Sequence, residues 1–126
     1  MINDNITVVK QLTFDSAHFL SNYDGLCKNM HGHTYKFELG ITGQIDEKTG
    51  MVMDFKIIKS EMNKIKELLD HKLLNEIEIY DFPKTNPTAE NMVIWIRNMF
   101  QNKFNNDSIT FIRLWETPTS YAEWRK

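Results

Sequence analysis

Two stretches near the start of the chain alternate apolar and polar residues with the period of a β-strand. Between residues 6 and 14 apolar side chains occupy every second position except Lys10, and between residues 34 and 42 the alternation is cleaner. A period of two places successive side chains on opposite faces of a strand. The pattern therefore predicts two strands, each with one buried face.

The middle of the chain changes to the period of an α-helix. Asp54 is a candidate N-cap for a helix over 55–69. The apolar residues that repeat along one face of this helix are Ile58, Met62, Ile65 and Leu69. A second helix is predicted to begin at Thr88, with Glu90 in its first turn, and to run to about Phe104. Both helices are therefore expected to bury one face.

Two further strands are predicted near the end of the chain, over 108–116 and 121–124, joined across Thr117-Pro118-Thr119. The order strand, strand, helix, helix, strand, strand contains no internal repeat. It predicts an α+β architecture, in which a four-stranded antiparallel sheet has both helices on one face. At 126 residues the chain has the size of a single domain, which we expect to span 1–126.

Composition narrows the classes of function. Fifteen basic and seventeen acidic residues are interleaved and leave a net charge of -2, so nucleic acid binding has no electrostatic support. The single cysteine, Cys27, has no internal disulfide partner, which is typical of a reducing compartment, and we expect a cytoplasmic location. The first residues match neither a secretory leader nor a membrane span, so no membrane partner is expected.

Three of the four histidines are predicted to converge. His31 and His33 are separated by one residue at the entrance of the second strand, so their side chains share a face. His18 has the parity of the buried face of the first strand, whose exit lies beside the entrance of its antiparallel neighbour. Buried imidazoles without a partner are costly. A zinc ion with an open fourth position fits three imidazoles best, although copper, nickel and iron also bind this ligand.

Cys27 lies shortly before His31, and the residues leave two roles open for it. As a fourth ligand its sulfur would close the coordination shell and make the zinc site structural. An uncommitted thiol beside a cation and an imidazole would instead have a depressed pKa and be reactive. The first role describes a zinc-stabilised module and the second an enzyme.

Asp70 and His71 form a candidate acid–base pair where the first helix ends. Adjacent residues do not face one another on a helix, so the two act together only if the chain has left helical geometry there. The negative helix end would favour a protonated His71, although a histidine in this position is commonly a cap. Glu116 closes the third strand, whose blurred alternation does not assign its face.

In their order along the chain, these residues resemble the 6-pyruvoyl-tetrahydropterin synthase superfamily, and within it the bacterial 6-carboxy-tetrahydropterin synthases. The resemblance covers nearly the whole chain. The segments that carry it are Phe14-Asp15-Ser16-Ala17-His18, Cys27 to Tyr35 with its His-Gly-His, Gly50-Met51-Val52-Met53-Asp54-Phe55, Asp70-His71 with Leu74-Asn75, Asn86-Pro87-Thr88-Ala89-Glu90-Asn91, and the Glu116 segment. Each piece is weak by itself, but the ordered set is specific.

The resemblance implies a role for each candidate residue. The zinc ligands that it implies are His18, His31 and His33. Cys27 would be the catalytic thiol, and Asp70 with His71 would exchange its proton. Glu116 would anchor the pterin ring and is a further candidate for the proton relay. The residues implied to bind the substrate are Glu116, Thr88 and Glu90.

The resemblance also implies a fold, an assembly and a reaction. The fold is the tunnelling fold, whose subunits form trimeric barrels that stack as homohexamers. The reaction is the zinc-dependent conversion of 7,8-dihydroneopterin triphosphate to 6-carboxy-5,6,7,8-tetrahydropterin, acetaldehyde and triphosphate in the queuosine pathway. Three residues separate Cys27 from the His-Gly-His, as in that bacterial branch. The alternatives are a 6-pyruvoyl-tetrahydropterin synthase, which leaves the side-chain carbons in place, and a noncatalytic zinc-stabilised module.

Overall fold

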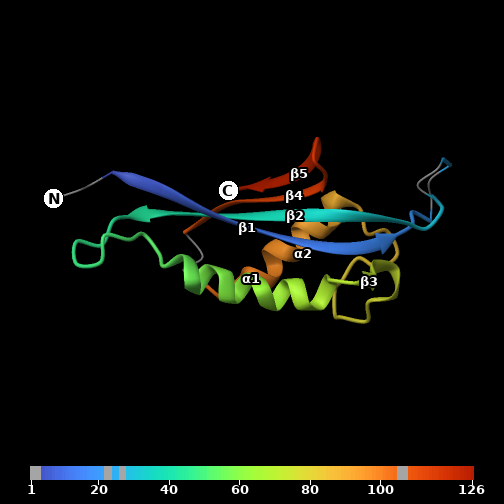
Figure 1. Cartoon of the computed structure of the whole chain (residues 1–126), viewed down its shortest axis with the longest axis horizontal. Coiled ribbons are helices and arrows are strands. Elements are labelled where there is room, and N and C mark those ends of the chain that lie inside the picture. Colours follow the sequence, from blue (N-terminus) through green and yellow to red (C-terminus); the bar gives the residue numbers. More distant parts are fainter. Residues whose placement is uncertain (1–3, 22–23, 26–27, 105–107) are drawn as a thin grey trace.

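A computed structural model describes residues 4–21, 24–25, 28–104 and 108–126 (Figure 1). Its elements are β1 (Asn5–His18), β2 (His31–Gln44), α1 (Phe55–Leu69), β3 (Lys72–Leu73), the 3-10 turn η2 (Leu74–Glu76), α2 (Ala89–Phe100), β4 (Ile109–Thr117) and β5 (Ser120–Arg125). The predicted α+β class and the order of the six main elements are confirmed. No helix in these ranges is both long enough and apolar enough to cross a membrane.

A single sheet with the strand order β3-β1-β2-β4-β5 forms the body of the protein. β1 and β2 make a long antiparallel hairpin, which pairs from Asn5 opposite Gln44 to His18 opposite His31. The predicted count of four strands is wrong by one. The additional strand, β3, pairs parallel with β1 only at Ser16 and Ala17, and two residues are too few to show an alternating pattern in the sequence.

The two helices cover the same face of the sheet (Figure 1). α1 packs against β1, while α2 packs against β4 and β5. The bounds predicted for α1 are confirmed. The predicted end of α2 near Phe104 is wrong, because the chain leaves helical geometry at Gln101, where ψ is 132°.

The hydrophobic core lies between the sheet and the helices. It includes the inward faces of β1 and β2, with Phe14, Tyr35 and Phe37 almost fully buried. The four residues predicted for the buried face of α1 are all buried. Ile6 is an exception to the predicted face of β1, since it is 41% exposed. Figure 1 shows that this end of the hairpin extends beyond the helices.

Gly40 of β2 faces the ring of Phe111 on β4, which leaves no room for a Cβ atom. We expect Gly40→Ala to lower the free energy of unfolding by about 1–3 kcal/mol, because the ring must move from its packed position. Denaturant titration measures this change. Gly32→Ala is the matched control, since its Cβ would meet nothing nearer than the Ser16 carbonyl oxygen at 3.7 Å. Equal unfolding midpoints for Gly40→Ala and the wild type would contradict this account.

Candidate metal centre

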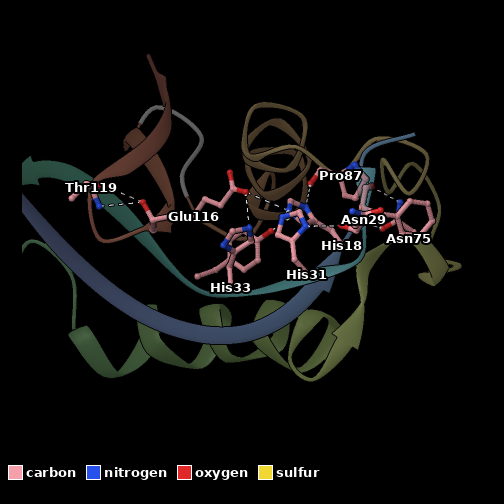
Figure 2. A network of polar contacts seen from close by, with 11 residues as sticks. His18, Asn29, His31, His33, Asn75, Pro87, Glu116 and Thr119 are labelled. Atoms are coloured by element: carbon pink, nitrogen blue, oxygen red, sulfur yellow. Dashed lines mark hydrogen bonds and ion pairs between the residues drawn. The ribbon is translucent and has the colours of Figure 1, made fainter. Parts of the chain in front are cut away.

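Three imidazole rings meet where the β1–β2 hairpin ends (Figure 2). His18 lies opposite His31 in the ladder, and His33 lies two residues further along β2. The Nε2 atoms of His18 and His31 are 3.0 Å apart, and the three ring centroids lie 4.6 to 5.0 Å from one another. The structure thus brings together the three histidines that the strand parity selects.

Backbone carbonyls hold the outer nitrogens of two of these rings. His18 Nδ1 donates to the Pro87 carbonyl at 2.9 Å, and His31 Nδ1 donates to the Asn29 carbonyl at 2.8 Å. Because a carbonyl only accepts, the proton of each neutral ring resides on Nδ1 and leaves a lone pair on Nε2. Two lone pairs 3.0 Å apart repel one another, and a cation or a proton between them removes that repulsion.

Tyr35 supports His18 from within the core. Its hydroxyl oxygen lies 3.2 Å from His18 Nδ1, and its side chain is fully buried. Burial raises the pKa of Tyr35 far above its ordinary value. The phenol therefore stays neutral and serves as a packing and hydrogen-bonding neighbour of the imidazole.

Glu116, near the end of β4, completes the cluster. Its Oε1 atom lies 2.8 Å from His33 Nε2 and 3.3 Å from His18 Nε2. His33 Nε2 is buried, and despite this short distance it lacks a partner with hydrogen-bond geometry among the described residues. One ligand atom from each of the four residues lies within 4.8 Å of the others. Sequence reasoning missed this placement, because the pattern of β4 does not show which face carries Glu116.

The pKa values of the cluster follow from burial and from the Glu116 carboxylate. Burial lowers the pKa of His33. Burial also acts to lower the pKa of His18, but hydrogen bonds to Glu116 and to the Pro87 carbonyl outweigh it and raise that pKa. The hydrogen bond from His18 in turn lowers the pKa of Glu116. When no cation is bound, a proton shared between His18 Nε2 and Glu116 thus removes the repulsion between the lone pairs of His18 and His31.

The donor set fits a divalent cation. Three imidazole nitrogens and one carboxylate oxygen are ligands that zinc accepts, and imidazole also suits copper, nickel and iron. The buried, unpartnered nitrogen of His33 and the facing lone pairs of His18 and His31 are the features that such an ion would satisfy. The residues present can therefore hold a metal.

Asp70 and His71 lie together but belong to a different group. His71 has a φ of 58°, so the chain has left helical geometry there, and its Nδ1 lies 3.1 Å from Asp70 Oδ2. The Asp15 amide donates to Asp70 Oδ1 at 2.9 Å, which lowers the pKa of Asp70. The ligand atoms of this pair cluster with Asp15 instead of with the imidazoles. The pair thus lies at the outer edge of β1, with the His71 side chain 79% exposed.

Of the predicted substrate-binding residues, Glu116 belongs to the cluster itself, and Thr88 and Glu90 lie at the start of α2. Thr88 is the N-cap of this helix, and Glu90 lies in its first turn. Glu90 and Glu116 line one hollow together with Tyr121 of β5. Cys27, the predicted catalytic thiol, lies outside the described residues.

The chain thus combines an α+β fold with three imidazoles where the β1–β2 hairpin ends and a carboxylate from β4, a class of protein whose site could hold a metal ion. The family model described as 6-pyruvoyl tetrahydropterin synthase matches residues 7–126. The chain therefore belongs to the 6-pyruvoyl tetrahydropterin synthase family, and the predicted resemblance is confirmed.

Individual relatives agree with this assignment. The chain is 37% identical to the 6-carboxy-5,6,7,8-tetrahydropterin synthase of Haemophilus influenzae, over 94% of this chain and 98% of that protein. It is 33% identical to the protein of the same name from Rickettsia conorii, over 94% and 99%. Caenorhabditis elegans 6-pyruvoyl tetrahydropterin synthase has a similar structure, with a TM-score of 0.88, 25% identity and coverage of 100% of this chain and 99% of that chain. The predicted fold is thus confirmed.

We expect His33→Ala to weaken zinc binding by more than the ~10–100-fold typical of changes in the surroundings of a metal ligand, because it removes a ligand atom itself. Competition with a chromophoric chelator measures this affinity. His71→Ala is the matched control and is expected to bind zinc as the wild type does, since its ring lies outside the cluster. Equal losses in the two variants would show that the cluster is not the binding site.

Proposed function

We propose that this protein is a zinc-dependent lyase that converts 7,8-dihydroneopterin triphosphate and one water molecule to 6-carboxy-5,6,7,8-tetrahydropterin, acetaldehyde and triphosphate, in the queuosine pathway. The observation that carries the proposal is the convergence of His18, His31, His33 and Glu116. Relatives named for this product match the chain over nearly their whole length, which supports the choice of reaction.

The three imidazoles are the zinc ligands in this proposal. An ion held by them would supply Lewis acidity, which would polarise the hydroxyl groups of the substrate side chain and make the neighbouring C–H groups more acidic. The carbonyls of Pro87 and Asn29 keep the rings of His18 and His31 in the tautomer that exposes Nε2. Such backbone contacts orient ligands and raise their basicity.

Cys27 is the proposed base that removes the substrate proton, with Asp70 and His71 exchanging the proton of its thiol. The contact between His71 Nδ1 and Asp70 Oδ2 suits this relay, because the carboxylate orients the imidazole ring that would carry the proton. The lowered pKa of Asp70 keeps that carboxylate charged. The relay needs Asp70 and His71 of one subunit to lie close to the metal centre of another, since within one chain they lie apart from it.

Glu116 is the proposed anchor for the pyrimidine ring of the pterin. Its lowered pKa keeps it as an acceptor for the N–H groups of that ring. The hollow that it shares with Glu90 offers the ring a place beside Glu116, whose carboxylate contacts His18 and His33. Thr88 helps to form this hollow indirectly, because its cap fixes the start of α2 and so the position of Glu90.

We propose a homohexamer built from two trimers as the working assembly. Among the described residues, β1 has a strand on its outer side only at Ser16 and Ala17, and β5 is the last strand at the other edge. Unpaired edges are templates for strands of another chain, and closing a barrel removes them. Pairing along the β1 edge would also bring Asp70 and His71 against a neighbouring subunit.

Incubation of the zinc-loaded protein with 7,8-dihydroneopterin triphosphate tests the reaction directly. We expect 6-carboxy-5,6,7,8-tetrahydropterin, acetaldehyde and triphosphate in equal amounts, identified by mass spectrometry and an aldehyde assay. A product that retains all the side-chain carbons would identify a 6-pyruvoyl-tetrahydropterin synthase instead. That second candidate is favoured by the similarity to the Caenorhabditis elegans structure.

Cys27→Ala separates the enzyme from a zinc-stabilised module. We expect the variant to keep its zinc and to lose turnover by about 10²–10⁴-fold, the contribution of a general base. Metal content, circular dichroism and turnover are measured on the same preparation. A variant that loses both zinc and fold would make Cys27 a fourth ligand and the chain a noncatalytic module.

A further inference from the structure

A side chain, and not a strand, holds the backbone immediately after His18. The Phe19 amide donates to Asn75 Oδ1 at 3.0 Å, and the Phe19 carbonyl accepts from Asn75 Nδ2 at 2.9 Å. A single amide group thus supplies the acceptor and the donor that a neighbouring strand would offer to the same residue. In Figure 2, Asn75 lies on the His18 side of the imidazole cluster.

Asn75 continues the edge pairing of β1 beyond the point where its strand partners end. β3 pairs with β1 at Ser16 and Ala17 only, and the ladder between β1 and β2 ends at the pair of His18 and His31. Asn75 follows β3 in η2, and its side chain takes over at the next residue, Phe19. His18 is therefore fixed on both sides, by the ladder before it and by this amide after it.

The ring of His18 makes contacts at both of its nitrogen atoms, so a shift of its backbone would disturb both contacts. Its Nδ1 donates to the Pro87 carbonyl, and its Nε2 faces His31 Nε2 and Glu116. Zinc–nitrogen bonds require distances correct to within about 0.2 Å. A histidine at a free strand end would lose that accuracy.

We infer that Asn75 is a positioning residue for His18, and that it sets the affinity and geometry of the metal centre without contacting the ion. This inference rests on the zinc site of the proposed function.

The test measures zinc affinity by chelator competition and the visible absorption of the Co²⁺-loaded protein. Asn75→Ala removes both hydrogen bonds to Phe19. We expect a 10–100-fold loss of zinc affinity, in the range found for partners of metal ligands, and a weaker or shifted Co²⁺ absorption. Asn75→Asp keeps the acceptor for the Phe19 amide and replaces the donor by a carboxylate oxygen, so it is expected to lose affinity as well. If Asn75→Ala does not fold, Asn75→Asp decides the question.

Ile58→Val is the matched control, because it shortens a buried side chain near the start of α1, away from the cluster. We expect it to lower the thermal midpoint and to leave zinc affinity and the Co²⁺ spectrum unchanged. Wild-type affinity and spectrum in both Asn75 variants would overturn the inference, as would an equal loss of affinity in Ile58→Val. A wild-type protein that binds no zinc would instead refute the metal site of the proposed function, which is a distinguishable result.

Discussion

Three imidazole nitrogens directed at one point are the constraint on which the rest of this site depends. Hydrogen bonds from Nδ1 to backbone carbonyls leave the Nε2 lone pairs of His18 and His31 facing one another. His18 is buried and His31 is partly buried, which limits the water that could separate these nitrogens. A cation or a shared proton between these nitrogens removes their repulsion, and the Glu116 carboxylate beside them supplies a negative charge that balances it.

The fold holds these rings through backbone geometry. The register of the β1–β2 hairpin sets His18 opposite His31. Beyond the end of this ladder, the side chain of Asn75 holds the backbone of Phe19. On the other side, the Asn91 amide donates to the Asn86 carbonyl at 3.0 Å, and its backbone N–H donates to the Thr88 hydroxyl. The Pro87 carbonyl between these two contacts is thus aimed at His18. The start of α2 therefore has two roles: it holds the ring of His18, and it borders the hollow proposed for the substrate.

The period of two in the sequence was enough to predict the imidazole cluster, because parity alone decides which face a strand residue occupies. Glu116 could not be placed in this way. Both faces of β4 are covered, one by the helices and one by a stack in which Arg113 lies over the rings of Phe111 and Tyr121. The register also shifts between Trp115 and Thr117, which interrupts the alternation at the decisive position.

Other features could not be placed from a single sequence for physical reasons. β3 forms through backbone pairing over two residues. Asn75 belongs to a segment that carries the family resemblance, but its hydrogen bonds to Phe19 join segments far apart along the chain. The pair of Asp70 and His71 was found from its position at a helix end, but its separation from the imidazoles follows from the parallel docking of β3 at the outer edge of β1. The pattern of residues along the chain does not show how far this pair lies from the imidazoles in space.

X-ray absorption spectroscopy at the zinc edge distinguishes a three-histidine site from one that includes the thiol, because it counts the atoms bound to the metal in the wild-type protein. We expect three imidazole nitrogens at about 2.0–2.1 Å, completed by oxygen or nitrogen, and no sulfur. A sulfur shell at about 2.3 Å would contradict this expectation, since the thiol of Cys27 would then be a permanent ligand and no longer available as a base.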